Sequence, residues 1–114
     1  MKPFISVMKA LSDPNRIKII KMLERKELCV CELTAALGLA QPTVSKHLKQ
    51  LEDAELVEYS KDGPWVNYRL AAEGDSPFAR AMLKQIRQWL NDEKDIANLI
   101  LQLPAFDRKL IKAP

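Results

Sequence analysis

Residues 27–48 read ELCVCELTAALGLAQPTVSKHL and predict two short helices joined by a turn. Cys29 and Cys31 are the only two cysteines of the chain, and they stand at the start of the first helix. Gly38 predicts the end of that helix, because glycine tolerates the positive φ of a helix C-terminus. The second helix has small polar and basic residues near its start. This layout is typical of a DNA-reading helix-turn-helix, which we place over residues 31–54.

The second helix is expected to have an apolar side and a polar side. Val44, Leu48 and Leu51 recur at i, i+4 and i+7, which predicts the side that faces the core. His47 lies about 60° from this apolar line at about 100° per residue, so we expect a half-buried, hydrogen-bonded histidine rather than a base contact or a metal ligand. The polar side faces outward, and its candidate DNA-binding residues are Gln41, Pro42, Thr43, Ser45, Lys46 and Lys49.

Residues 56–71 predict a β-hairpin, because apolar and polar residues alternate on both sides of a turn at residues 62–64. The residues expected on its apolar face are Val57, Tyr59, Val66, Tyr68 and Leu70. A hairpin directly after a reading helix is typical of a wing, and Lys61 near its tip is a further candidate DNA contact. In the alternative interpretation, Asp62 makes the tip unattractive to DNA and the hairpin only braces the domain.

Asp13 and Pro14 predict the start of a helix that reaches about Arg25, with Asp13 as the N-cap. We expect Ile17, Ile20 and Leu23 on the inner side of this helix. The basic residues that fall mostly on its other side are Arg16, Lys18, Lys21 and Arg25. We interpret that side as a solvated face, with contact to the DNA backbone as the alternative.

The two terminal segments, residues 3–11 and 77–103, predict helices with more apolar surface than one small core can cover. The apolar residues of the first segment recur at helical spacing and are Phe4, Ile5, Met8 and Leu11. The second segment predicts one long helix with two apolar lines, capped by Ser76 and stopped by Pro104. Because a domain of this size offers little core, we expect a two-fold homodimer in which these helices pack on their copies.

The length and composition predict a single domain over residues 1–114. The expected elements make it mainly α-helical with a small β-hairpin (α+β), in a winged helix-turn-helix arrangement. No apolar run approaches the roughly 20 residues of a membrane span, and the first residues lack the features of a signal peptide. We therefore expect a cytoplasmic protein with reduced thiols and no membrane partner. The net charge of +3 is modest, so attraction to DNA phosphates must be local.

The sequence gives no support for an enzyme. It has a single histidine without a plausible nucleophilic partner, no glycine-rich phosphate loop, and no paired-carboxylate motif. A binding or regulatory function is therefore expected.

The helix order, the LCVCEL and QPTVSKHL motifs and the wing resemble the ArsR/SmtB family of metal-sensing repressors over about residues 9–103. The cysteine motif is most similar to that of the arsenical-responsive members. The resemblance implies a dimeric winged-helix repressor that binds double-stranded operator DNA and leaves it when the inducer binds. It further implies that Cys29 and Cys31 bind trivalent arsenic or antimony, with no permanently bound cofactor, and that Gln41, Thr43, Ser45 and Lys46 lie in or near the major groove.

Thr34 marks a departure from the arsenical pattern, in which many members carry a third cysteine one helical turn after the pair. Since the chain has no other cysteine, a three-sulfur site within one subunit is excluded. Water, hydroxide or a small thiol would then supply the third ligand. The resemblance disfavours cadmium, lead and zinc, because the extra N-terminal cysteines and the last-helix histidine of those sensors are absent here.

The spacing of the two cysteines predicts a switch. On a regular helix, side chains at i and i+2 point about 200° apart, so one ion holds both only if the helix start unwinds. We expect the helix dipole and exposure to lower the thiol pKa values. The alternatives are a thiol-redox switch on the same DNA-binding repressor, structural cysteines in a repressor with another effector, and a protein-interaction module without DNA binding. The operator should be an imperfect inverted repeat with half-sites one or more helical turns apart.

Overall fold

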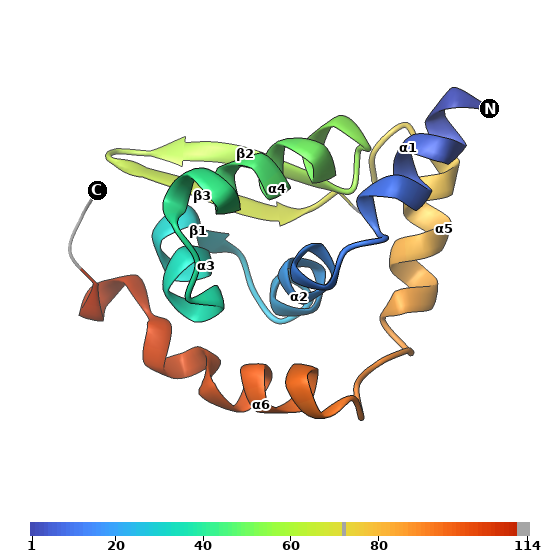
Figure 1. Cartoon of the computed structure of the whole chain (residues 1–114). Helices are drawn as coiled ribbons and strands as arrows, with labels where there is room; N and C mark the ends of the chain where they lie inside the picture. The colour runs from blue at the N-terminus through green and yellow to red at the C-terminus, as the bar shows by residue number, and fades with distance from the viewer. Residues whose placement is uncertain (72, 112–114) are drawn as a thin grey trace.

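A computed structural model of the chain describes residues 1–71 and 73–111; residues 72 and 112–114 of the predicted 1–114 domain lie outside the described residues. Helices pack against a small antiparallel sheet, which confirms the expected winged helix-turn-helix fold (Figure 1). The elements in chain order are α1 (Lys2–Ala10), α2 (Pro14–Leu23), β1 (Leu28–Cys29), α3 (Val30–Leu37), α4 (Gln41–Asp53), β2 (Val57–Asp62), β3 (Trp65–Leu70), α5 (Pro77–Ile86), α6 (Lys94–Gln102), and the 3-10 turns η1 (Leu103–Phe106) and η2 (Arg108–Leu110).

Two helix ends form where the sequence predicts them, the start of α2 and the end of α3. The carboxylate of Asp13 accepts hydrogen bonds from the backbone N–H groups of Asn15 and Arg16 at 2.8 and 3.1 Å, and so caps α2. At the end of α3, Gly38 has a φ of +67°, the left-handed conformation that glycine adopts at least cost. These two ends determine where α2 begins and where α3 stops.

The sheet has three strands in the order β1-β3-β2, one more than the predicted hairpin. In the hairpin, Tyr59 lies opposite Tyr68, and Gly63 enters the turn with a φ of +60°. The additional strand β1 is only two residues long, and it pairs Cys29 with Asn67 of β3. The cysteine segment is therefore part of the same sheet as the wing.

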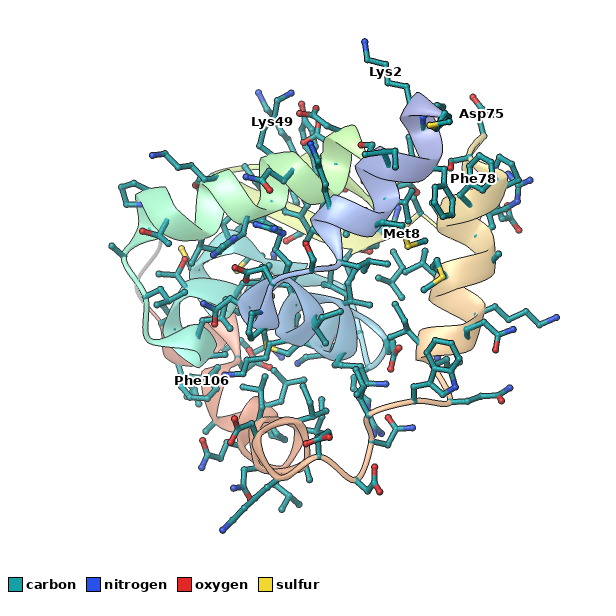
Figure 2. The ribbon with its side chains drawn as sticks, turned by 45° about the vertical axis from the view of Figure 1, so that its right-hand side comes forward. Lys2, Met8, Lys49, Asp75, Phe78 and Phe106 are labelled. Atoms are coloured by element: carbon teal, nitrogen blue, oxygen red, sulfur yellow. The ribbon has the colours of Figure 1, made fainter. Side chains whose placement is uncertain are left out.

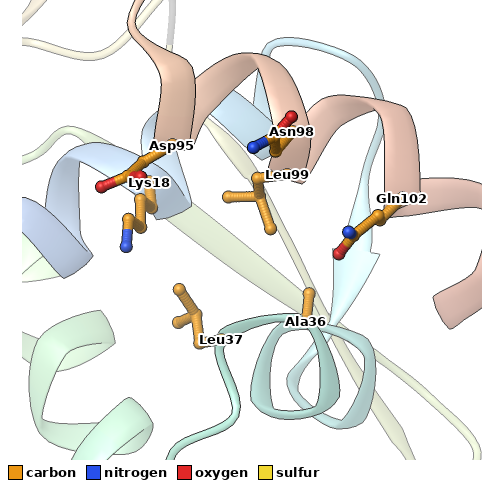
Figure 3. Close-up of a pocket in the computed structure, with 7 residues that line it drawn as sticks. All are labelled: Lys18, Ala36, Leu37, Asp95, Asn98, Leu99 and Gln102. Atoms are coloured by element: carbon orange, nitrogen blue, oxygen red, sulfur yellow. The ribbon is translucent and has the colours of Figure 1, made fainter.

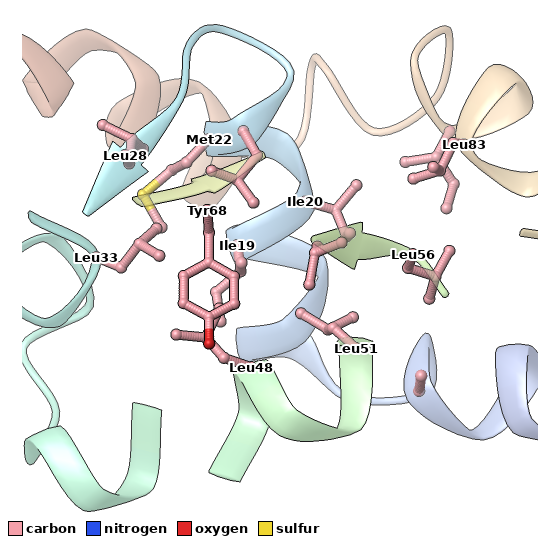
Figure 4. Packing of buried hydrophobic residues seen from close by; sticks show 14 of the residues in the cluster. Ile19, Ile20, Met22, Leu28, Leu33, Leu48, Leu51, Leu56, Tyr68 and Leu83 are labelled. Atoms are coloured by element: carbon pink, nitrogen blue, oxygen red, sulfur yellow. The ribbon is translucent and has the colours of Figure 1, made fainter. Parts of the chain in front are cut away.

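The core lies between α2, α4 and the sheet, as Figure 4 shows for its buried apolar side chains. The inner side of α4 is confirmed, because Val44, Leu48 and Leu51 are fully buried. The prediction for α1 is wrong in detail, since Val7 and Ala10 face the core. The predicted apolar residues Phe4 and Ile5 are about 40% exposed.

The predicted solvated face of α2 needs two corrections. Ile17 is only half-buried, whereas Ile19 and Met22 are completely buried. Lys21, which we expected at the surface, is 1% exposed. Its ammonium group lies 2.8 Å from the Glu24 carboxylate and donates hydrogen bonds to two backbone carbonyl groups near the end of α5. Burial of this charge is possible because the carboxylate and the carbonyl oxygens replace its hydration shell.

The predicted single helix over residues 77–103 is also wrong. The chain forms α5, leaves helical geometry after Ile86, and resumes as α6 at Lys94. Lys21 binds the carbonyl oxygens of Ile86 and Trp89 at 3.0 Å each, and Leu90 takes a φ of +67°. The Lys21 ammonium thus supplies hydrogen bonds to carbonyl groups that lack helical partners, and α5 ends at Ile86. As a result α6 turns back and packs along α2 (Figure 1).

Candidate functional site

The two cysteines lie at the junction between β1 and α3 and are both free thiols. Cys29 is the N-cap of α3 in an extended conformation, with φ −81° and ψ 164°, and is 1% exposed. Cys31 is in the first turn of α3 and is half-buried. The prediction that both cysteines belong to one regular helix is therefore wrong, because Cys29 is a strand residue.

Glu32 holds the backbone of Cys29 in place. Its Oε1 accepts a hydrogen bond of 2.8 Å from the backbone N–H of Cys29, an arrangement that satisfies one of the free N–H groups at a helix start. Burial raises the pKa of the Cys29 thiol to about 11, and the carboxylate of Glu32 adds to the rise. The expected lowering of this pKa is thus wrong, since desolvation of the buried thiol is the largest effect.

Thr34 follows Cys31 by one helical turn. Its hydroxyl oxygen is buried and has no hydrogen-bond partner among the residues that the structure describes. Over the same residues, no three histidine, cysteine or carboxylate side chains are grouped so as to hold a metal ion. A ligand from solution that completes such a site remains a prediction.

The outer side of α4 presents a row of polar and basic side chains, among which Figure 2 labels Lys49. The predicted DNA-binding residues that are exposed there are Gln41, Pro42, Thr43, Ser45, Lys46 and Lys49. Lys49 pairs with Asp53 at 3.1 Å, whereas Lys46 forms no ion pair with any described residue. Lys46 is thus the α4 lysine with its charge least compensated. Lys61 is also exposed, on β2 of the wing.

His47 confirms the prediction of a half-buried, hydrogen-bonded histidine. Its Nδ1 lies 3.2 Å from Nη1 of Arg16, which therefore donates to the ring. Arg16 also donates to the carbonyl oxygens of Ala10 and Lys9 at the end of α1, at 2.6 and 3.2 Å. Arg16 thus ties α1 to α4 and is not a freely solvated side chain.

A small pocket separates α6 from the helix-turn-helix. Figure 3 shows Lys18 of α2 and Ala36 and Leu37 of α3 facing Asp95 and Leu99 of α6 across a space of about 180 Å³. Binding pockets for small molecules are usually about 300 Å³ or more, and this one contains neither cysteine. It does not compete with the cysteine pair as a sensing site.

The apolar surface of α1 and α5 differs in detail from the predicted one. Phe4 and Phe78 are each about 40% exposed and meet edge to face, with ring centroids 5.5 Å apart. Figure 2 shows Phe78 beside α1, on the side of the molecule away from the wing. The helices α1 and α5 therefore share one partly exposed apolar surface.

Comparison with known proteins identifies the family. The model for the bacterial regulatory protein, arsR family, matches residues 13–59, which run from the N-cap of α2 into β2. The arsenic resistance transcriptional regulator ArsR1 of Pseudomonas putida is 41% identical over 92 residues, which are 76% of this chain and 71% of that protein. The chain belongs to the ArsR family. This ArsR-family chain is also 42% identical over 72 residues to the arsenical resistance operon repressor of Staphylococcus xylosus, covering 63% of the chain and 69% of the repressor.

The ArsR-family fold is confirmed by a solved structure, the homodimeric winged helix-turn-helix DNA-binding domain of a possible ArsR-family transcriptional regulator from Mycobacterium bovis. It superposes with a TM-score of 0.66 at 27% identity, over 89% of this chain and 83% of that one. The family consists of bacterial regulatory proteins, which agrees with the interpretation of the sequence as a transcriptional regulator rather than an enzyme. Among the helices of residues 1–71 and 73–111, none is both long and apolar enough to traverse a lipid bilayer.

Proposed function

We propose that this ArsR-family protein is a dimeric transcriptional repressor that binds operator DNA and is released when trivalent arsenic or antimony binds Cys29 and Cys31. The observation that carries this proposal is the position of the two free thiols at the junction of β1 and α3, because α3 leads through the turn at Gly38 into α4. Relatives named for arsenic resistance support the choice of inducer. Cytoplasmic conditions, which keep thiols reduced, suit this chemistry.

The DNA-binding half of the proposal rests on α4. Its polar side is exposed over its whole length, while Val44, Leu48 and Leu51 anchor the opposite side in the core. An exposed, rigidly packed helix that starts with small polar residues suits the major groove. We assign base and phosphate contacts to Gln41, Pro42, Thr43, Ser45, Lys46 and Lys49, with Lys61 of the wing near a neighbouring phosphate.

The dimer follows from the apolar surface shared by α1 and α5. In a single chain this surface leaves Phe4 and Phe78 partly exposed. Packing against the same surface of a second copy would bury both rings and give the two-fold arrangement that a palindromic operator requires. The two α4 helices would then meet half-sites of an imperfect inverted repeat.

The donor atoms suit a thiophilic ion. Sulfur ligands favour soft ions, and both cysteines are present as thiols. Each sulfur–arsenic bond forms as a thiol proton leaves with one hydroxyl of arsenite as water, so prior ionisation of Cys29 is not needed. Cys31, the less buried thiol, is the first to react, and Cys29 follows. Hydroxide or a small thiol completes the ligand set.

Joint binding must disturb the start of α3. The Cys29 side chain is buried, and its backbone N–H is held by Glu32. Bringing its sulfur to an ion shared with Cys31 changes the N-cap geometry and weakens that hydrogen bond. Because α3 packs directly on α4, the new geometry shifts the reading helix relative to the wing. By linkage, the ion then lowers DNA affinity by the same factor as DNA lowers ion affinity.

The experiment is a titration of the purified protein, bound to DNA from its own promoter, with arsenite and antimonite under reducing conditions. We expect arsenite to release the DNA from the native protein and from neither Cys29→Ser nor Cys31→Ser, while both variants keep their DNA affinity without arsenite. DNA release from both serine variants at the native arsenite concentration would contradict the proposal. Release by an oxidant, reversed by a reductant and indifferent to arsenite, would establish the redox switch instead.

A further inference from the structure

Glu32 binds two segments that are far apart in the sequence. Its Oε1 accepts from the backbone N–H of Cys29, and its Oε2 accepts from the backbone N–H of Arg108 in η2, both at 2.8 Å. The residue is only 6% exposed, so water competes weakly for these bonds. The position of the C-terminal turn η2 is thus set by the same carboxylate that holds the first cysteine.

The side chain of Arg108 continues from this point to the wing. Its guanidinium lies 5.3 Å from the ring centroid of Trp65, and its Nη2 lies 3.3 Å from a carboxylate oxygen of Asp62. Its Nη1 donates to the side-chain oxygen of Asn67 at 3.4 Å. Asn67 is the sheet partner of Cys29, and Asp62 pairs with Trp65 across the wing turn. Arg108 therefore contacts Glu32 through its backbone and the wing through its side chain.

The charge of Arg108 matters as much as its position. Asp62 stands at the end of β2, where a carboxylate would repel DNA phosphates. Pairing with Arg108 compensates this negative charge, and stacking on Trp65 holds the guanidinium in place. A wing that retains Arg108 is therefore both better ordered and less repulsive to DNA than a wing that has lost it.

We propose that Arg108 is a positioning residue that couples the cysteine pair to the wing, through the Glu32 carboxylate. This inference rests on the proposed function. When the thiols bind an inducer and the backbone of Cys29 moves, Glu32 moves with it and Arg108 loses its backbone anchor. The guanidinium then leaves Asp62 and Trp65, so the wing loses both its support and its charge compensation. DNA affinity falls through the wing in addition to the change in α4.

The test uses the fluorescence of Trp65. Because Trp65 and Trp89 are the only tryptophans, a Trp89→Phe background makes Trp65 the sole reporter of the wing. Arg108→Ala, Arg108→Lys and the neighbouring control Lys109→Ala are made in that background, and thermal melts verify that each variant folds. Arsenite binding is followed separately by the ultraviolet absorption of the sulfur–arsenic bonds, and DNA affinity is measured with and without arsenite.

We expect arsenite to change Trp65 emission in the background protein and in Lys109→Ala, and to leave it unchanged in Arg108→Ala although arsenite still binds. Without arsenite, Arg108→Ala should bind DNA about three- to tenfold more weakly, the size expected from a partly exposed ion pair and a cation–π contact. Arg108→Lys keeps the positive charge but lacks the planar guanidinium. Compared with Arg108→Ala, it should therefore restore part of the Trp65 response and part of the DNA affinity.

An unchanged Trp65 response and an unchanged arsenite effect on DNA affinity in Arg108→Ala would overturn this inference and leave the proposed function intact. Absence of the sulfur–arsenic absorption in the background protein would show instead that the proposed function fails, and the coupling role with it.

Discussion

The ammonium of Lys21 lies 2.8 Å from the carboxylate of Glu24, and both side chains are almost completely buried. The same ammonium donates to the carbonyl oxygens of Ile86 and Trp89, so this pair connects α2 to the end of α5. A buried ion pair contributes little net stability compared with apolar residues, but the loss of one partner leaves an uncompensated buried charge.

Replacement of Lys21 by methionine should therefore destabilise the protein by about 3–5 kcal/mol. The double variant Lys21→Met/Glu24→Met should recover most of that loss, because no charge then remains buried. Denaturation with urea, followed by circular dichroism, measures both free energies of unfolding. If Lys21→Met alone were as stable as the native protein, the fold would not depend on this ion pair.

Replacement of Thr34 by cysteine should raise the affinity for arsenite. Thr34 lies one helical turn after Cys31, and its buried hydroxyl lacks a partner within the described part of the chain, so a thiol there costs no hydrogen bond. A third protein sulfur would replace the ligand supplied by solution. Competition with a dithiol of known arsenite affinity gives the comparison, and Thr34→Ser is the matched control that should bind as the native protein does.

Stability should fall at alkaline pH because of Cys29. Its pKa is raised from the ordinary value of 9.0 to about 11, mainly by burial. The folded state thus favours the neutral thiol, so this contribution is complete below pH 9 and is lost as the pH rises from 9 to 11. Urea unfolding across this range should show a steeper fall for the native protein and for Cys31→Ala than for Cys29→Ala. Equal slopes in all three proteins would refute the raised pKa.

Lys46 and Lys49 should differ in their contribution to DNA binding. Lys46→Ala should lower the slope of log affinity against log salt concentration by about two per dimer, since each subunit loses one phosphate contact and each contact releases roughly one counterion. Lys49 is already paired with Asp53, so Lys49→Ala should reduce the slope less. Lys84, an exposed lysine on α5, provides the control, and its replacement by alanine should leave the slope unchanged. Equal salt slopes for the Lys46 and Lys84 variants would contradict the placement of α4 at the DNA interface.

A charge at Phe78 should weaken the proposed dimer. Phe78→Asp places a carboxylate in the apolar surface that α5 shares with α1, and we expect the dimer dissociation constant to rise about tenfold or more. Leu101→Asp is the control, because Leu101 is 80% exposed on α6, outside that surface. Sedimentation equilibrium measures both. A dimer that is equally stable with either substitution would place the interface elsewhere.

The sequence predicts those elements whose signals are local. The cap at Asp13, the left-handed residue Gly38 and the apolar side of α4 depend on neighbouring residues, and all three are present in the structure. The exposure of the α4 side chains follows from the same helical periodicity. Their contacts with DNA remain a prediction.

The features that the sequence did not predict depend on contacts between distant residues. Apolar periodicity continues from α5 through α6, but Lys21, more than 60 positions away, binds the carbonyl groups at which the helix ends. Strand β1 is two residues long and exists only because β3 pairs with it. The raised pKa of Cys29 also depends on distant contacts, because the thiol is buried where β1 pairs with β3. The sequence prediction considered only the helix dipole and exposure, which would lower this pKa.

The pairing of Cys29 with Asn67 has a mechanical consequence for the wing. Asn67 follows the turn glycine Gly63 by four residues, so about 13 Å of chain extends from this pair to the tip at about 3.3 Å per residue. A rotation of roughly 10° about the pair would displace the tip by about 2 Å, comparable to the distance from the hydrogen to the acceptor in a hydrogen bond. A small displacement of the Cys29–Asn67 pair would therefore be larger at the tip of the wing.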